Sequence, residues 1–201
     1  MTRLIIATTV LIVLFLASSV HAGVADAAAI VTRLHDNLLS VMKEADALAV
    51  KGRYQRLSPE IERSFHLRLM ARVTSGTTWK KAATAQKDSL TRAFARLSVA
   101  TYASRFDGYS GQRFETTGER PGPRATHLVD TRILSPGEQP VPLTYVLKQI
   151  DGRWGIVDVL LDTGISELAV RRSEYRSVLK KGGVDGLITV LNAKADELLS
   201  P

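Results

Sequence analysis

The chain has 201 residues, carries a net charge of +7 and contains no cysteine. This length is typical of one domain with a sizeable core. Without cysteine, disulfides, zinc–thiolate sites and thiol catalysis are excluded, so the packed interior must hold the fold together. The positive charge either favours anionic membranes and acidic partners or serves only solubility.

The N-terminal segment has the three parts of a secretory signal. Arg3 supplies a positive charge, residues 4–17 form an uncharged and mostly apolar run, and Val20–Ala22 resembles a cleavage site. The alternative is an uncleaved anchor, but the run is shorter than the roughly 20 residues that span a bilayer. We therefore predict that residues 1–22 are removed and that 23–201 form a single domain in the periplasm, where nucleic acid is not an expected partner.

The first predicted helix of the mature chain covers residues 23–50. Its apolar residues recur at intervals of three and four, which is the spacing of one helix face. Lys51 and Gly52 are expected to end this helix.

A helical hairpin is predicted for residues 54–110. Ser58 and Pro59 have the pattern of an N-cap followed by proline in the first turn, so a new helix is expected to start there. Residues 76–79 break the apolar pattern, and a long helix is predicted from residue 84 to about residue 106.

The middle of the chain is predicted to form strands that are separated by turn signals. Asp151-Gly152 joins two alternating runs and is typical of a tight hairpin. Sequential hairpins of this kind give an antiparallel sheet. The four predicted strands are Arg113–Gly118, Ala125–Leu134, Leu143–Ile150 and Arg153–Leu161.

The C-terminal segment returns to helix. Ser166 is expected to cap one helix, Gly182-Gly183 to end it, and Val184 to begin a last helix. The order of helices, strands and helices predicts an α+β fold, in which a curved antiparallel sheet of about four strands packs against N- and C-terminal helices.

No pattern for a metal, nucleotide or cofactor site is present. His35, His66 and His127 lack metal-ligand spacing to one another or to carboxylates, and His21 lies in the predicted signal segment. The sequence also lacks a nucleophile elbow, a P-loop and a dinucleotide fingerprint. We therefore expect no cofactor and no bound metal, and His127 is interpreted as an exposed or hydrogen-bonded strand residue.

Asp158 is an acidic residue inside the apolar run WGIVDVLLD, and it has two interpretations. It is either a general base in a pocket or a structural carboxylate that accepts hydrogen bonds from loop amides or pairs with Arg132, Arg153 or Lys148. The structural interpretation is preferred, because no second group of an acid–base pair can be identified.

Three segments carry a family resemblance. The strand WGIVDV, the turn before Ser166 and the motif GGVDGLITVL follow one another between residues 154 and 191. FHLRLMAR at 65–72, followed by Trp79, and FARLSVATYASRF at 94–106 precede them. In order and spacing these segments resemble the MlaC-type (toluene-tolerance) periplasmic lipid-binding proteins.

Two segments are more similar to the hopanoid-associated HpnM branch of that family, namely TYASRFDGYSG and SELAVRRSEYRSVLKKGG. Two departures from the general family pattern also occur. Thr163 is an extra residue in the acidic-Gly turn, and residues 171–176 replace an Asn-Tyr-Arg helix. These departures concern the contacts to a lipid head group more than the fold.

The resemblance implies an NTF2-like cone with an internal apolar cavity. It implies a non-enzymatic, monomeric carrier that holds a hopanoid or a phospholipid and shuttles it between inner and outer membrane. An inner-membrane transporter complex and transient contact with anionic membrane surfaces are the implied partners. A head group would lie at the mouth of the cavity, where Arg or Lys meets a phosphate.

The apolar residues alone leave a filled core and a cavity wall as alternatives. The face that each strand turns inward is also open, because a shift of one residue reverses it. A filled core would indicate a structural adaptor, and Asp158 as base would indicate an enzyme on the same fold. With the family as guide, the predicted lipid-binding wall is Phe65, Met70, Phe94, Leu97, Tyr102, Phe106, Phe114, Val129, Ile133, Tyr145, Leu147, Ile156 and Val159.

Overall fold

A computed structural model describes residues 20–161 and 164–200, so the predicted signal segment lies almost wholly outside the described part. Helices precede and follow one sheet, which confirms the α+β prediction. None of the helices in the described residues is long and apolar enough to cross a membrane. The elements are α1 (Val20–Lys43), α2 (Ala45–Ser64), α3 (Leu67–Ser75), α4 (Thr77–Lys81), α5 (Thr84–Arg105), β1 (Arg113–Gly122), β2 (Thr126–Leu134), β3 (Val141–Ile150), β4 (Arg153–Leu161), β5 (Ile165–Ser166) and α6 (Glu167–Leu198).

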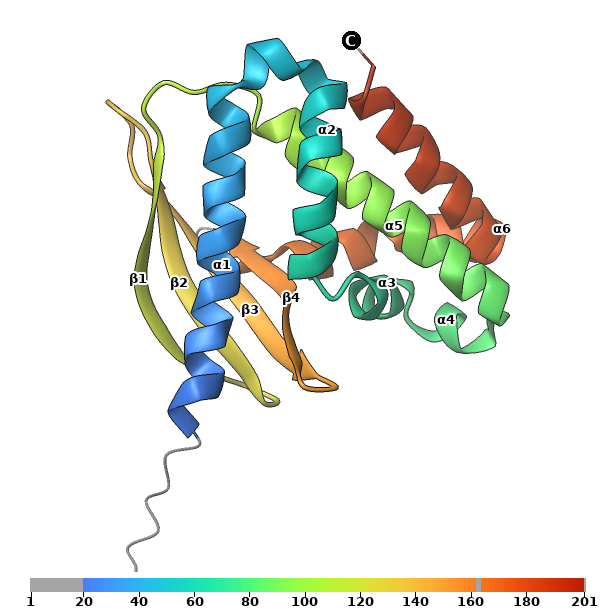
Figure 1. The fold of residues 1–201 in the computed structure, drawn as a ribbon. Coiled ribbons are helices and arrows are strands. Elements are labelled where there is room, and N and C mark those ends of the chain that lie inside the picture. The colour runs from blue at the N-terminus through green and yellow to red at the C-terminus, as the bar shows by residue number, and fades with distance from the viewer. Residues whose placement is uncertain (1–19, 162–163, 201) are drawn as a thin grey trace, which may run out of the picture.

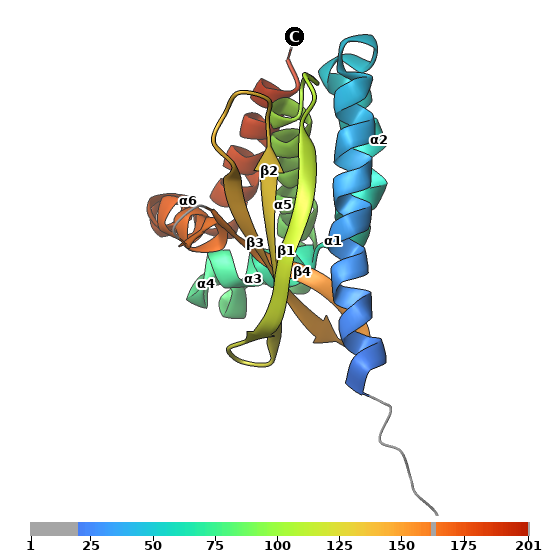
Figure 2. The ribbon, with the colours of Figure 1, turned by 90° about the vertical axis from the view of Figure 1, so that its left-hand side faces the viewer.

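The sheet is antiparallel, and its strands pair in chain order from β1 to β5. The predicted turn at Asp151-Gly152 is confirmed: both residues have positive φ, 50° and 77°, as a two-residue hairpin requires. The short strand β5, which pairs with Leu160 and Leu161, was not expected from the sequence. The sheet is curved and unclosed, as Figures 1 and 2 show.

A bulge in β4 decides which side chains face the interior. Tyr145 pairs with Val159, and Leu147, two residues on, pairs with Ile156 rather than residue 157. In a regular strand, positions 156 and 159 would lie on opposite faces, because successive side chains alternate. The extra residue brings Ile156 and Val159 to the same face of the sheet.

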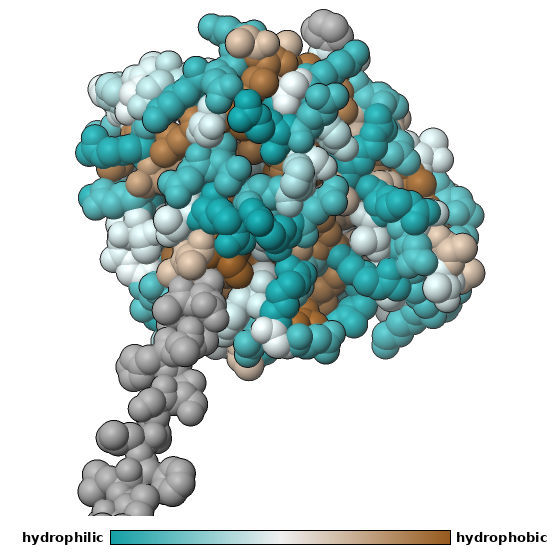
Figure 3. Space-filling model, in the orientation of Figure 1, coloured by the Kyte–Doolittle hydropathy of each residue, from teal (hydrophilic) through white to brown (hydrophobic). Residues whose placement is uncertain are grey.

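The helices pack on the sheet and on one another. Helix α1 runs along the sheet, and α5 and α6 lie against each other beyond it (Figures 1 and 2). In the orientation of Figure 1, the surface is mostly hydrophilic, and hydrophobic residues are visible only in narrow strips between the polar side chains (Figure 3). The largest fully buried side chains come from both layers, namely Phe94, Leu34, Leu38, Leu57, Ile61, Leu90, Leu147, Ile156, Leu187, Leu191, Val31 and Val41.

The predicted helix of residues 23–50 is divided, because α1 ends at Lys43 and a second backbone break follows at Ala49, with φ 48° and ψ 179°. The expected stop at Gly52 and the expected start at Ser58-Pro59 are wrong, since α2 continues through both. Arg53 fixes this corner, because its guanidinium donates to the carbonyls of Ala45 (3.0 Å) and Ala103 (2.8 Å). These long-range bonds outweigh the local preferences of glycine and proline.

The C-terminal boundaries are confirmed. Ser166 caps α6, where its hydroxyl accepts a hydrogen bond from the backbone N–H of Ala169 (2.9 Å). Gly183 has φ 61° and ψ −154°, which interrupts α6 and separates residues 167–182 from the last helical stretch. A residue with a Cβ atom would be strained at this φ.

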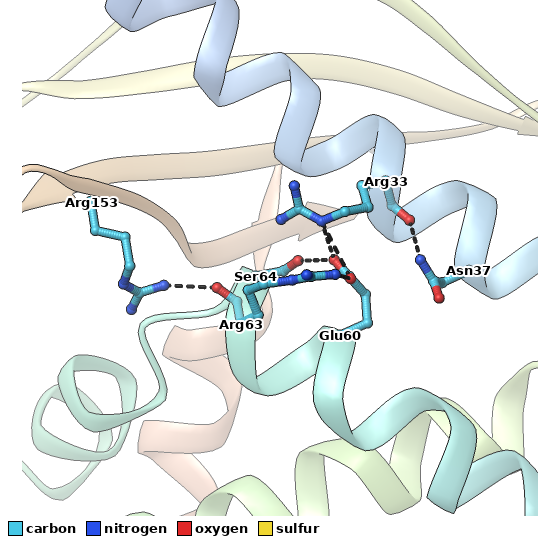
Figure 4. Close-up of polar contacts among 6 residues, drawn as sticks. All are labelled: Arg33, Asn37, Glu60, Arg63, Ser64 and Arg153. Carbon is cyan, nitrogen blue, oxygen red and sulfur yellow. Dashed lines mark hydrogen bonds and ion pairs between the residues drawn. The ribbon is translucent and has the colours of Figure 1, made fainter.

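A buried carboxylate ties α1 to α2. Glu60 is 3% exposed, and Arg33 of α1 donates to it at 3.0 Å, while Arg63 and Ser64 bind it from the next turn of α2. Figure 4 shows these side chains converging on the carboxylate. Burial alone would raise the pKa of Glu60, but the bonds from Ser64, Arg63 and Arg33 outweigh it and lower the pKa below its ordinary value of 4.5.

Candidate ligand-binding cavity

A cavity of about 220 Å³ lies between the helices and the sheet. Helix α5 forms one wall, β2 to β4 form the other, and the end of α2, α3 and the first turns of α6 close the sides. Its lining is mostly apolar and consists of Ile61, Phe65, Met70, Ser98, Thr101, Tyr102, Arg105, Phe106, Ile133, Leu143, Tyr145, Val159, Leu161, Glu167, Leu168 and Arg171.

The structure brings seven of the thirteen predicted wall residues to this cavity, namely Phe65, Met70, Tyr102, Phe106, Ile133, Tyr145 and Val159. The other six lie in the surrounding apolar core and do not border the cavity. These six are Phe94, Leu97, Phe114, Val129, Leu147 and Ile156. The interior is therefore not completely filled by side chains, which argues against the structural adaptor.

Part of the lining could have been found from the sequence. Ser98, Thr101, Tyr102 and Arg105 of α5 all border the cavity, and their spacing of three and four residues places them on one helix face. A search restricted to large apolar side chains misses the polar members of this face. Other lining residues, such as Leu143, follow from strand alternation once one inward residue is known.

Aromatic rings form one side of the cavity. The ring centroids of Phe65 and Tyr102 lie 5.8 Å apart, those of Tyr102 and Phe106 lie 5.7 Å apart, and Phe114 continues the row 6.2 Å from Phe106. These separations are typical of favourable aromatic pairs. The row makes this wall apolar and stiff.

A neutral polar pair lies beside this row. His35 stacks on Phe114 at 4.1 Å, and its Nε2 atom forms a 3.0 Å hydrogen bond with the hydroxyl of Tyr145. Burial lowers the pKa of His35 to about 4 and raises the pKa of Tyr145 well above its ordinary value. Both groups are therefore uncharged at neutral pH, and this part of the wall carries no charge.

The charged residues of the lining gather near the hydroxyl of Tyr102. Burial raises the pKa of Tyr102 to about 12, while the nearby charges of Arg171 and Arg105 lower it and Glu167 raises it further. With two positive groups and one negative group, this end of the cavity has a net charge of +1. The geometry suits an amphiphile whose chain lies among the rings and whose polar end lies here.

Asp158 does not border the cavity. Its carboxylate accepts hydrogen bonds from the backbone N–H groups of Val159 (2.9 Å) and Leu168 (3.0 Å) and from the hydroxyl of Ser166. This confirms the structural interpretation with loop amides as partners. Asp158 therefore holds the turn into α6 rather than facing a bound ligand as a general base.

The remaining histidines make structural contacts. His66 Nε2 lies 3.0 Å from the carbonyl of Lys148, and His127 lies 2.9 Å from a carboxylate oxygen of Glu119. His127 is thus a buried, hydrogen-bonded residue, one of the two outcomes predicted for it. No group of three or more metal-binding side chains occurs in residues 20–161 and 164–200.

Comparison with known proteins agrees with this architecture. The fold is similar to that of a phospholipid-binding protein from Ralstonia solanacearum, solved in complex with a phospholipid, with a TM-score of 0.75 and 22% sequence identity. The similarity covers 87% of this chain and 99% of that one. The model of the family described as MlaC protein matches residues 32–193, which is most of the sequence. The chain belongs to the MlaC family.

Proposed function

We propose that this protein is a soluble carrier that binds a lipid in its cavity and moves it between inner and outer membrane. The observation that carries the proposal is the mostly apolar cavity between α5 and the sheet, with charged residues gathered at one end. Membership of the MlaC family and the phospholipid bound to the Ralstonia protein support the same class of ligand.

The energetics of transfer favour an apolar cavity. Burying one CH₂ group contributes about 0.8 kcal/mol, so a chain of about 14 carbons costs roughly 11 kcal/mol to expose to water. A cavity walled by aromatic and aliphatic side chains offers the chain an environment close to that of the bilayer. The carrier therefore needs no chemical step, and its partners determine the direction of transport.

The size of the cavity constrains how the ligand enters. At about 220 Å³ the cavity is smaller than the roughly 300 to 1,000 Å³ of pockets that hold drug-sized ligands. A whole hopanoid or phospholipid is larger still, so we expect the walls to separate when cargo binds. Of the two cargo lipids, the phospholipid is supported by the bound lipid of the Ralstonia protein, and the hopanoid by the resemblance to the HpnM branch.

The location and the partners follow from the same proposal. Cleavage of residues 1–22 would release the domain formed by residues 23–201 into the periplasm, where we expect a monomer. A basic face formed by α3, α4, α6 and the start of α5 supports transient contact with anionic membranes or with an inner-membrane transporter complex. Arg72, Lys80, Lys87 and Arg172 line one groove on this face, which has no carboxylate in its lining.

The proposal is tested by mass spectrometry of an organic extract of protein purified without detergent. We expect a stoichiometric lipid in the extract of the natural protein. The variant Ser98→Phe fills the cavity from α5 and should lose the lipid, whereas Ser177→Phe makes the same change on an exposed part of α6 and should retain it. Lipid-free extracts of the natural protein would refute the proposal.

A further inference from the structure

One nitrogen of a charged side chain in the cavity lining has no hydrogen-bond acceptor among the described residues. Arg171 lies in the second turn of α6, and its Nη1 atom is buried without a hydrogen-bond partner among the described residues. Its Cζ atom lies 5.5 Å from the centroid of the Phe94 ring, so one face of the guanidinium is covered by an aromatic side chain. A buried guanidinium nitrogen without an acceptor is costly, because its hydration is lost and not replaced.

The other charges of the cavity do not supply the missing acceptor. Glu167 lines the same end of the cavity, but no ion pair joins it to Arg171 within the described part of the chain. Arg105 is a second cation and cannot accept a hydrogen bond. The hydroxyl of Tyr175 is a hydrogen-bond partner of this guanidinium, but the Nη1 atom of Arg171, at the charged end of a mostly apolar cavity, is left without an acceptor.

We propose that Arg171 recognises the anionic group of the cargo, so that this carrier selects phosphate- or carboxylate-bearing acyl lipids over uncharged lipids such as hopanoids. This inference rests on the proposed function. A guanidinium matches the oxygens of a phosphate or a carboxylate in a fixed planar geometry. The acyl chain would extend from Arg171 along the aromatic row, where Phe65 and Phe106 lie.

The neighbouring residues strengthen the assignment. The cation–π contact with Phe94 holds the guanidinium in place, so less conformational freedom is lost when an anion binds. Burial raises the pKa of Tyr102 to about 12, which keeps its hydroxyl protonated and able to donate to the same anion. An uncharged ligand would leave Arg171 buried and unpaired in the complex.

The experiment compares two lipids that differ only in the phosphate. Delipidated full-length mature protein is titrated with oleoyl lysophosphatidic acid, with monooleoylglycerol and with inorganic phosphate, and binding is followed by isothermal calorimetry. A charge-assisted hydrogen bond in a buried site corresponds to about a tenfold to hundredfold preference for the charged lipid. Inorganic phosphate alone should not bind measurably, because the apolar wall contributes nothing to its affinity.

The variants assign the preference to one side chain. Arg171→Gln should reduce the preference to less than about threefold, and Arg171→Lys should keep only part of it, because the charge remains but the planar donor geometry is lost. Arg176→Gln removes a charge from the exposed face of the same helix and should leave the preference unchanged. Circular dichroism confirms that each variant is folded.

The outcomes separate the inference from the proposed function. Equal affinities of the natural protein for the two lipids would overturn the role of Arg171 and leave the carrier intact. A preference that survives Arg171→Gln would also overturn it. Failure of both lipids to bind would refute a carrier of acyl lipids. Binding of inorganic phosphate as tightly as lysophosphatidic acid would indicate a simple anion site and contradict the lipid assignment.

Discussion

Two charged side chains of this protein, the buried Glu60 and the half-buried Arg171, stand in opposite situations. Glu60 lies between α1 and α2, and two arginines and one hydroxyl of the same chain bind its carboxylate. Arg171 lies at the cavity, and its buried nitrogen has no acceptor within the described residues. The first charge is compensated by the fold, and the second is the group that we propose binds the anionic end of the cargo.

This difference separates a structural charge from a candidate recognition site. A buried ion pair contributes to the native state only while all its partners are present, and removing one partner is costly. A charge without a partner contributes nothing to folding and is costly to bury, so it is expected to serve a ligand. Substitutions at the two sites should therefore have opposite effects on stability.

The largest effect is expected when Glu60 loses its arginines. The double variant Arg33→Gln/Arg63→Gln leaves a buried carboxylate with only Ser64, so the free energy of unfolding at neutral pH should fall by about 3 to 5 kcal/mol. Urea denaturation followed by circular dichroism measures the change. The matched control, Arg56→Gln, breaks the exposed pair with Glu44 and should cost less than about 1 kcal/mol. A similarly small loss of unfolding free energy in the double variant and in Arg56→Gln would contradict the claim that the two arginines compensate the charge of Glu60.

Acid should weaken the fold in two steps. The folded pKa of His35 is about 4 instead of 6.5, so unfolded chains bind a proton that native chains do not, and stability is lost as pH falls from 6.5 to 4. The loss is roughly 3 kcal/mol. Below pH 4.5, protonation of Glu60 removes a further contribution, since its folded pKa is lowered.

The variant His35→Gln isolates the first step. It keeps a polar partner for Tyr145 but cannot titrate, so urea denaturation at a series of pH values should show a shallower decline between pH 6.5 and 4. The remaining slope is expected from His66, whose pKa is lowered by burial and by the charge of Arg153. An unchanged slope in His35→Gln would contradict the buried, neutral state of His35.

A smaller effect is expected at the turn into α6, where a half-buried carboxylate is compensated by local donors. Ser166→Ala removes the cap of α6 and one hydrogen bond to Asp158, so thermal denaturation should report a loss of about 1 kcal/mol. Ser177→Ala, on the exposed face of α6, should leave stability unchanged. Equal values for the two variants would show that Asp158 and the cap do not stabilise the turn.

The smallest effect on stability is expected at the cavity. Arg171→Gln removes an unpaired charge, so the free energy of unfolding of the lipid-free protein should stay within about 1 kcal/mol of the natural value or rise. Urea denaturation of delipidated samples provides the measurement. A loss as large as that of the Glu60 double variant would mean that Arg171 has a partner within the chain, and the comparison would then fail.

Local chemistry explains which parts of the fold could be predicted. The Asp151-Gly152 turn, the cap at Ser166 and the interruption at Gly183 depend on neighbouring residues alone, and all three are confirmed. The boundaries near Gly52 and Pro59 were wrong, because contacts of distant residues decide them. The bonds of Arg53 to carbonyls eight and fifty residues away are of this kind.

In the cavity, too, some residues are placed by local spacing and others by contacts between distant parts of the chain. Helical spacing on α5 relates Ser98 and Thr101 to the predicted Tyr102, so these lining residues could have been predicted from the sequence. The bulge in β4 could not be foreseen, and it decides that Ile156 and Val159 share a face. The placement of Arg171 depends on how α6 docks on the rest of the fold, which no local pattern specifies.

The central claim is that a lipid chain occupies the space between α5 and the sheet. A crystal structure of the natural protein, purified without detergent, tests it most directly. The account predicts continuous density for an acyl chain along Phe65, Tyr102 and Phe106, with its anionic group within hydrogen-bond distance of Arg171. A cavity filled only by ordered water or by rearranged side chains would contradict it.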